Sequence, residues 1–250
     1  MEKENAIGAI KQLRRSLIVM TITVLIFAAI SFNFSEQLRG LLLAPGEEAF
    51  LRLESEGVKV GLIFLTPAEA LLANLRLSFI TSFIVTLPLI LFQILGLAMT
   101  FTGKKRRNAL LLSFIMYLLF LAGIAFAYFV VLRFAMNFFI GFSSPDLVPH
   151  FSIARYISFS TSFILSFGLV FQLPVLFWFL GSIGLVKADF LRRSRRVALL
   201  IIVIFAAILT PPDVFSQILM AIPLMLLYEL GIFMVFLVQR KKEPAINESD

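Results

Sequence analysis

The sequence of 250 residues contains no cysteine and only one histidine, His150. Disulfide bonds, thiolate metal ligands and cysteine nucleophiles are therefore excluded, and one imidazole cannot form a histidine-based metal cluster. A phosphate-binding GxxxxGK[ST] loop is also missing, as is any Ser/His/Asp or paired-carboxylate set that can be placed together. These absences argue against ATP-driven pumping by this chain alone and against hydrolysis. We therefore expect no enzyme, no cofactor and no bound metal.

Charge is scarce and apolar side chains are abundant. Only 15% of the residues are charged, 60% are hydrophobic, and the mean hydropathy is +0.99. A soluble domain needs a larger polar surface than this composition supplies, so the sequence indicates an integral membrane protein. The net charge of +7 comes from short basic clusters between apolar runs. Such clusters are typical of cytoplasmic loops, so no nucleic-acid partner is expected.

Long uncharged runs predict the membrane spans, because a spanning helix needs about 20 mostly apolar residues. The fifth run ends at Pro211 and the sixth is interrupted by Glu229, so both of these helices are expected to be short. The first run has no small-residue cleavage site after it and is therefore interpreted as a retained helix. The sequence thus predicts an all-α protein, one integral membrane domain over 1–250, with six transmembrane helices near 16–35, 75–101, 108–132, 154–184, 197–210 and 214–238.

Basic residues predict the orientation. Most of the 22 Lys and Arg residues precede the first span, lie in the second and fourth loops, or follow the last span. Because these positions share one face of the membrane when the number of spans is even, both termini are expected to be cytoplasmic. Residues 36–70 then form an outer loop, in which "EEAFLRLESEG" predicts a short interfacial helix. Residues 239–250 are expected to form a flexible cytoplasmic tail.

The clearest strongly polar side chains within the predicted spans are those of Gln93, Gln172, Gln217 and Glu229. Polar groups are costly in hydrocarbon and usually face a protein interior or a wet cavity. An interhelical hydrogen bond is one interpretation for each glutamine. For Gln172 the alternative has equal weight, because Pro174 removes a backbone donor nearby and can kink the helix. A kinked helix with a polar side chain beside the kink could line a groove.

The stretch "ILTPPDVFSQILMAIP" predicts a sharp turn between the last two spans. Pro211 and Pro212, after Thr210, stop the fifth helix, and Asp213 is placed to cap the N-terminus of the sixth. Pro223 is expected to bend the sixth helix. Physically, these residues require no more than a tight hairpin turn.

Three stretches resemble a known family in their order and in the helices that carry them. They are "AGIAFAYFVV" (122–131), "SFGLVFQLPVLF" (166–177) and "AAILTPPDVFSQILMAIPLMLLYELGIF" (206–233). They resemble TatC, the core subunit of the twin-arginine protein translocase. Weaker similarity is found in "LRRSL" (13–17), "TPAEALLANLR" (66–76) and "PLILFQILGLA" (88–98).

The resemblance implies a glove-like bundle of six helices in the bacterial or archaeal cytoplasmic (inner) membrane. It implies that the protein recognises folded proteins by their twin-arginine signal peptides and recruits single-span Tat partners of the TatA/TatB type. Transport would be driven by the proton-motive force. The resemblance also allows a homo-oligomer within the translocase.

The resemblance also assigns site residues. Signal-peptide binding falls to Gln12, Leu13, Arg14 and Lys105. The resemblance implies a partner contact at Gln172, and the other intramembrane candidates, chosen for their polarity or as a helix break, are Pro174, Gln93, Gln217 and Glu229. The structural turn is Thr210, Pro211, Pro212 and Asp213, and the family positions of the outer loop are Pro45, Pro67 and Glu69.

Three of these positions depart from the family pattern, which has glutamate where this chain has Gln12, Lys105 and Gln172. A carboxylate pairs well with a guanidinium group, whereas a lysine repels it. One interpretation is a translocase subunit that binds signals through other groups, such as Glu2, Glu4, backbone carbonyls or a partner subunit. The alternative is a divergent paralogue with altered or lost recognition of twin-arginine signals.

A different class remains as a distant alternative. The chain could be a small-solute secondary transporter with Gln172 and Glu229 as substrate ligands. Such transporters often contain inverted repeats with broken helices in both halves. The sequence shows no such internal symmetry.

Overall fold

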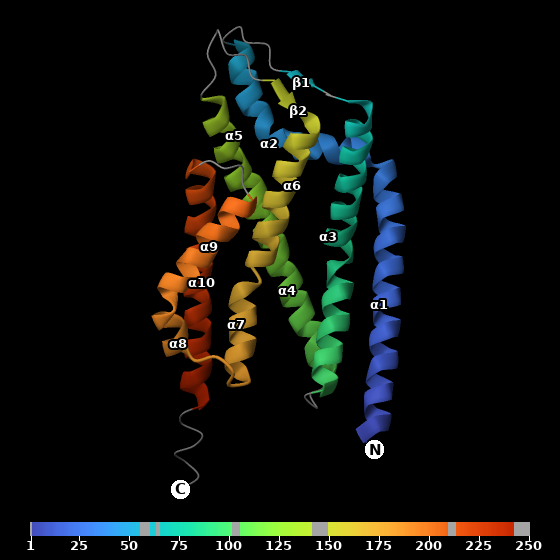
Figure 1. Ribbon diagram of the computed structural model, residues 1–250, viewed down its shortest axis with the longest axis vertical. Helices are drawn as coiled ribbons and strands as arrows, with labels where there is room; N and C mark the ends of the chain where they lie inside the picture. Colours follow the sequence, from blue (N-terminus) through green and yellow to red (C-terminus); the bar gives the residue numbers. More distant parts are fainter. Residues whose placement is uncertain are drawn as a thin grey trace. The chain divides into compact units, whose positions relative to one another are not determined.

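A computed structural model describes residues 2–55, 61–63, 66–101, 106–141, 150–209 and 214–242 (Figure 1). The described elements are helices, apart from one small sheet with three residues in each strand. The predicted all-α class is therefore confirmed.

Five described segments are long and apolar enough to cross a membrane: Leu13–Asn33, Ala68–Gly96, Ala109–Ile140, Ile153–Ser182 and Gln217–Arg240. The fifth predicted helix, α9 (Arg195–Leu209), has only 15 residues. At 1.5 Å per residue it is about 23 Å long, which is less than the hydrocarbon thickness of about 30 Å. The expected short fifth helix is therefore present.

The last helix, α10 (Val214–Lys242), has 29 residues and is longer than the short sixth helix that was expected. Pro223 lies inside it without ending it, because one missing N–H is tolerated in a membrane helix whose neighbours compensate. Residues 239–242 were expected to begin a flexible tail, yet they belong to this helix. The rest of that predicted tail, 243–250, lies outside the described residues.

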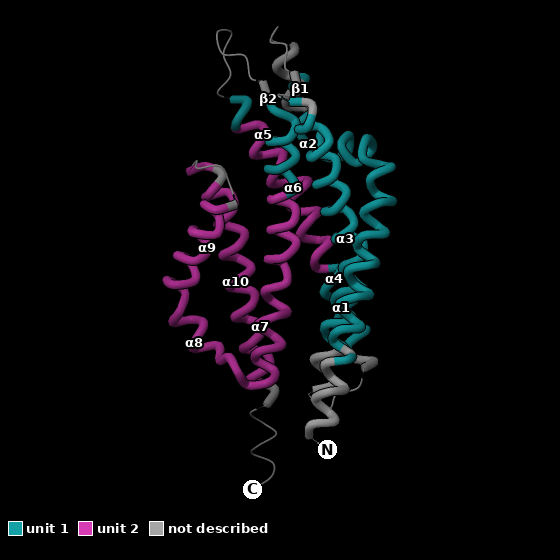
Figure 2. Tube along the Cα trace, turned by 45° about the vertical axis from the view of Figure 1, so that its right-hand side comes forward, with its two compact units in different colours: residues 1–118, 139–161 teal, residues 119–138, 162–250 magenta. Residues whose placement is uncertain are grey.

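The chain divides into two compact units, shown in teal and magenta in Figure 2. The first unit comprises 1–118 and 139–161, and the second comprises 119–138 and 162–250.

In the first unit, α1 (Glu2–Asn33) and α3 (Pro67–Phe101) run side by side in opposite directions (Figures 1 and 2). Ser78, Ser82 and Thr86 follow one another at four-residue intervals on α3 and are buried. The Ser82 hydroxyl donates to the Val24 carbonyl of α1 at 2.5 Å. Small polar side chains let two membrane helices approach closely and bond to each other, which explains this pairing.

The predicted outer loop, 36–70, contains regular structure. Helix α2 (Ser35–Ser55) occupies much of it, so the expected interfacial helix is the C-terminal part of a longer one. Strand β1 (Gly61–Ile63) pairs in parallel with β2 (His150–Ser152), with Gly61 opposite His150. The sequence analysis did not predict this sheet.

The remaining helices differ from the predicted spans in two places. The span expected at 108–132 continues to residue 140 through a five-residue π-helix, whereas the span expected at 154–184 is divided in two. The elements are α4 (Arg106–Phe126), η1 (Ala127–Val131), α5 (Leu132–Ile140), α6 (Ile153–Val170), α7 (Leu173–Ser182) and α8 (Ala188–Arg193).

Glycines allow close helix contacts within the second unit. A Cβ atom at Gly123 of α4 would lie 2.6 Å from the carbonyl oxygen of Phe167 on α6. A Cβ atom at Gly231 of α10 would collide with the ring of Phe177 on α7. Gly184 ends α7, because its φ of +81° belongs to the left-handed region that glycine adopts at low cost.

Candidate functional site

The chain breaks between α6 and α7, where Pro174 predicts an interruption. Phe171 and Gln172 form a turn, in which the Gln172 N–H donates to the Leu169 carbonyl at 3.0 Å. Pro174 has no N–H to donate to the carbonyl of Val170, so the normal α-helical bond cannot form there. The fourth predicted span is thus two stacked helical pieces joined at Gln172.

The Gln172 side chain is half-buried at this break, and Pro174 is buried. The Nε2 group of Gln172 donates to the carbonyl of Gly168 at 3.4 Å. This bond is long, and it stays within the same helical segment. A neutral amide offers both donors and acceptors, so this position presents hydrogen-bonding groups without charge.

Aromatic rings join the break to the π-helical segment. The ring of Phe126, immediately before η1, lies 5.8 Å from the ring of Phe171 and 5.6 Å from that of Phe167, centroid to centroid. These tilted contacts bury a large apolar area. They hold the turn that carries Gln172 against the end of α4.

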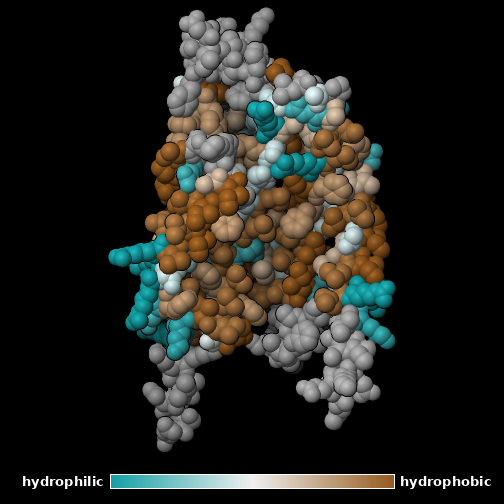
Figure 3. Space-filling view, viewed as in Figure 1, coloured by the Kyte–Doolittle hydropathy of each residue, from teal (hydrophilic) through white to brown (hydrophobic). Residues whose placement is uncertain are grey.

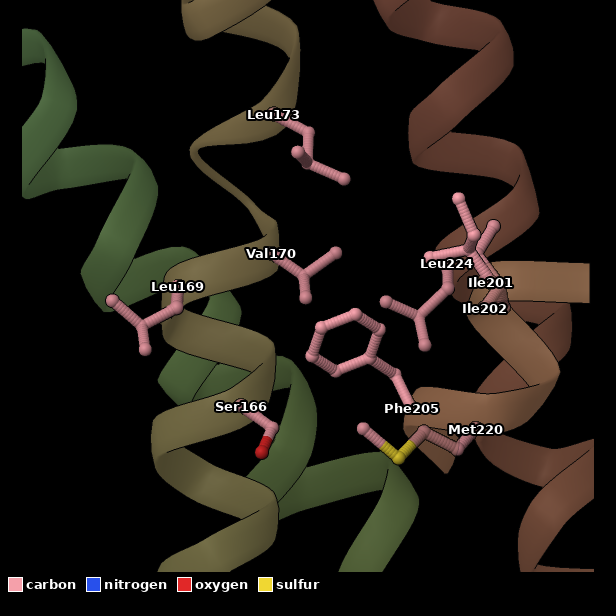
Figure 4. Close-up of a pocket in the computed structure, with 9 residues that line it drawn as sticks. All are labelled: Ser166, Leu169, Val170, Leu173, Ile201, Ile202, Phe205, Met220 and Leu224. Carbon is pink, nitrogen blue, oxygen red and sulfur yellow. The ribbon is translucent and has the colours of Figure 1, made fainter. Parts of the chain in front are cut away.

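An apolar cavity of about 390 Å³ lies beside the break. Its lining residues come from the end of α6, the start of α7, α9 and α10 (Figure 4), and Ser166 is the one polar residue among them. The apolar lining residues are Leu169, Val170, Leu173, Ile201, Ile202, Phe205, Met220 and Leu224. In Figure 4 the ring of Phe205 reaches from α9 towards Val170, and the ribbon loses its coil between Val170 and Leu173. The cavity therefore combines an apolar lining with a nearby break in the backbone.

The helices on the far side of the cavity are joined by polar side chains. The Nε2 group of Gln217 on α10 donates to the Val203 carbonyl of α9 at 3.1 Å. The Arg195 guanidinium donates to Glu229 Oε2 at 2.7 Å, again between α9 and α10. The interhelical hydrogen bond predicted for Gln217 is therefore present, and Glu229 has a charged partner.

The short helix α8 is bonded to the middle and the C-terminal end of α10. The Tyr228 hydroxyl donates to the Leu191 carbonyl at 2.8 Å, and the Ala188 N–H donates to Gln239 Oε1 at 3.2 Å. The Arg192 guanidinium lies 5.3 Å from the ring centroid of Phe236. α10 is thus fixed to α7, α8 and α9 within the second unit.

The predicted outer-loop positions all belong to the first unit. Glu69, in the first turn of α3, accepts a hydrogen bond from the Ser152 hydroxyl of β2. Pro67 is the first residue of α3, and Pro45 is buried inside α2. Gln93 lies half-buried on α3. These residues therefore belong to a different unit from Gln172, Gln217 and Glu229.

The proposed signal-binding positions are only partly described. Leu13 and Arg14 are exposed on α1, and Gln12 lies in the same helix with a side chain outside the description. Lys105 lies outside the described residues, and so do Thr210, Pro211, Pro212 and Asp213. In the described parts of the chain, no three His, Asp or Glu side chains are grouped as a metal site requires.

The cavity residues on α9 and α10 were missed by sequence reasoning. Ile201, Phe205 and Leu224 are apolar residues within apolar runs, so nothing in the sequence distinguishes them from side chains that face lipid. The only signal in the sequence was indirect, namely Gln172 and Pro174, which flank the lining residue Leu173 without lining the cavity themselves.

Comparisons with known proteins agree along nearly the whole chain. A family model described as "Sec-independent protein translocase protein (TatC)" matches residues 9–223. The protein of that name from Carboxydothermus hydrogenoformans is 35% identical over 235 residues, which is 93% of each chain. The one from Aquifex aeolicus is 35% identical over 239 residues, 94% of this chain and 95% of its own.

The fold is also similar to a solved structure. A crystal structure described as "Twin Arginine Translocase Receptor- TatC" superposes with a TM-score of 0.81 at 33% sequence identity. The match covers 92% of this chain and 99% of the other.

Proposed function

Because the chain belongs to the TatC family of Sec-independent protein translocase proteins, we propose that it recognises the signal peptides of folded proteins within a twin-arginine translocase. Family membership makes it a multi-pass membrane component of a protein translocase and not an enzyme. The observation that carries the proposal is the match in sequence and fold to a protein described as a translocase receptor.

Signal recognition in this chain must use groups other than the two family glutamates. Gln12 and Lys105 stand at those positions, and neither can form a carboxylate–guanidinium pair. Glu2 and Glu4, which precede Gln12 in the sequence, are the acids proposed to replace them. Backbone carbonyls or a partner subunit are the other sources of acceptors.

The break at Gln172 and the adjacent cavity are the proposed contact site for a single-span Tat partner. The lining offers apolar contact to the side chains of a transmembrane helix, and the amide can bond a polar residue on that helix. Gln217 and Glu229 are assigned instead to the contact between α9 and α10, where each bonds α9. Gln172 and Pro174 are therefore the core of the proposed partner site.

We place the chain in the cytoplasmic (inner) membrane with both termini in the cytoplasm. Support comes from the basic clusters in the first half of α1, between α7 and the start of α9, and at the end of α10. The proton-motive force is the proposed energy source, which agrees with a sequence that contains no nucleotide-binding loop.

Export of a reporter protein tests the function. The chain is produced, with its cognate partner subunits, in a bacterial strain that lacks its own TatC, and export of a twin-arginine reporter is followed. We expect export that depends on the two signal arginines. A chain that inserts stably but exports nothing contradicts the proposal.

Gln12 and Lys105 favour a second candidate, a paralogue with altered or lost twin-arginine recognition. In that case the double change Gln12→Glu and Lys105→Glu should create or increase export. The matched control is Gln12→Glu with Lys104→Glu, which changes the net charge equally. Full export by the unchanged chain excludes this candidate.

The small-solute transporter receives no support from the structure, because Glu229 is bonded to Arg195 and not directed at a cavity ligand. Solute uptake by the purified chain alone in proteoliposomes would restore it.

A further inference from the structure

The start of α9 and the elements around it carry a dense group of basic side chains, which we call the basic edge. Its members are exposed, and Figure 3 shows hydrophilic side chains gathered at the lower left, where α8 and the start of α9 lie in Figure 1. The bond between the Ala188 N–H and Gln239 brings the start of α8 to the end of α10. The basic edge consists of Lys187, Arg192, Arg193, Arg195, Arg196 and Arg240.

Two of these cations are neutralised within the protein. Arg195 pairs with Glu229 at 2.7 Å, and Arg192 lies 3.6 Å from Asp189. For the other four, the part of the chain that the structure describes contains no acidic partner. The basic edge therefore keeps an excess of positive charge, with Arg193 and Arg196 at its centre.

A row of exposed apolar side chains begins beside these two arginines. Four of them lie on α9 at intervals of three or four residues, and one, Phe190, lies on α8. We call this row the apolar stripe; it consists of Phe190, Val197, Leu200, Ile204 and Ile208. Each of these side chains is between 49% and 73% exposed. Residues spaced in this way share one face of a helix. Arg196 lies four residues before Leu200 on α9, and Arg193 ends α8 two residues before α9 begins, so both cations lie near the N-terminal end of the stripe.

We propose that Arg193 and Arg196 bind the phosphate of an anionic phospholipid whose acyl chain lies along the apolar stripe. Guanidinium groups match phosphate oxygens in geometry and charge, and arginine stems can extend along apolar surface while the head stays at the headgroup level. Clustered Lys and Arg residues next to a transmembrane helix commonly attract anionic lipids. The excess charge favours this occupant over a neutral apolar helix, because only an anionic ligand balances both arginines.

This inference does not rest on signal recognition, so lipid binding by the purified full-length chain tests it separately. Native mass spectrometry measures how much protein carries a bound lipid as palmitoyl-oleoyl phosphatidylglycerol is added. The zwitterionic phosphatidylcholine with the same chains is the reference lipid. We expect phosphatidylglycerol to bind more tightly, and the double variant Arg193→Gln, Arg196→Gln to bind it about tenfold more weakly.

The matched control is Lys11→Gln, Arg15→Gln, which removes the same charge from exposed positions on α1. This control variant should bind phosphatidylglycerol as tightly as the unchanged chain does. The double variant Arg193→Lys, Arg196→Lys should keep most of the affinity for phosphatidylglycerol. All variants should retain the melting temperature of the parent chain, since Arg193 and Arg196 have no ion pair within the described residues to lose.

Three results would overturn the proposal. The first is equal binding of the two lipids by the unchanged chain, and the second is equal loss in the Arg193, Arg196 variant and the α1 control. The third is a variant with unchanged lipid binding but reduced association with a protein partner, which would assign the basic edge to that partner. Displacement of phosphatidylglycerol by inorganic phosphate at the same concentration would contradict the part of the proposal that assigns the acyl chain to the apolar stripe.

Discussion

The contact between α9 and α10 and the break between α6 and α7 both place polar groups inside apolar spans, but they use them differently. Between α9 and α10, Gln217 bonds the Val203 carbonyl and Glu229 pairs with Arg195, so each polar group joins two helices. At the break, Gln172 makes a long bond to Gly168 within its own helical segment, and the residues Val170 and Leu173 on either side of the break line the cavity. The first region uses its polar groups to hold two helices together, and the second carries its polar group at a break in the backbone.

The difference shows that a polar residue within a span does not by itself mark a binding site. The group to which that residue is hydrogen-bonded decides whether it is interpreted as structural or as part of a binding site. Substitution of a residue bonded across two helices is expected to change stability more than binding of a Tat partner. Substitution of Gln172 is expected to change partner binding more than stability.

The largest effect on stability is expected where α10 packs against α7. Gly231→Leu would drive a side chain into the Phe177 ring and should lower the free energy of unfolding by about 3 kcal/mol. Gly40→Leu is the control, because a Cβ atom there has nothing within 4 Å. Unfolding in detergent by chemical denaturant, followed by circular dichroism, measures both. Equal losses would mean that close packing does not hold α10 in place.

The Arg195 and Glu229 pair should have a smaller effect. Because the side chains are 48% and 39% exposed, we expect a coupling free energy of only about 1 kcal/mol between them. A double-mutant cycle with Arg195→Gln, Glu229→Gln and the combined variant gives this value. A coupling near zero would remove the pair from the contacts that join α9 to α10.

Gln217→Leu is expected to cost about 0.6 kcal/mol, the typical value of an interhelical hydrogen bond in a membrane protein. The Val203 carbonyl lies inside α9, so its helical hydrogen bond should remain after the amide is lost. The same denaturant experiment measures the change. A loss above about 2 kcal/mol would indicate that the amide has a larger structural role than one bond.

Gln172→Leu should change stability least, by less than about 0.5 kcal/mol, because its amide bond to Gly168 is 3.4 Å long. Leucine is similar in size and suits an apolar neighbourhood. A large loss of stability would move Gln172 into the same class as Gln217.

Much of the fold could be predicted from apolar runs and proline. The all-α class and the short α9 follow from hydropathy, and the missing N–H of Pro174 made a kink one expected alternative, although the division of that span into two helices was not predicted. The length of α10 could not be predicted, because the pairing of Glu229 with Arg195 depends on a tertiary contact. The π-helix at Ala127–Val131 was also missed, since a shift in backbone register leaves no mark in an apolar run.

Only the part of the candidate site at the break between α6 and α7 could be predicted from the sequence. Gln172 and Pro174 stand out in sequence because they are polar or lack a donor, whereas Phe205 and Leu224 complete the cavity without any distinguishing chemistry. The roles of Gln217 and Glu229 could not be told from that of Gln172 until their partners on α9 were known.

Co-purification of the single-span Tat partner with Gln172→Leu and with Gln217→Leu tests the central claim most directly. Both variants remove one amide from an apolar span and differ only in the region that loses it. Our account predicts that Gln172→Leu inserts normally but retains much less partner than the unchanged chain, while Gln217→Leu retains the same amount. Equal partner recovery from the two variants would contradict it.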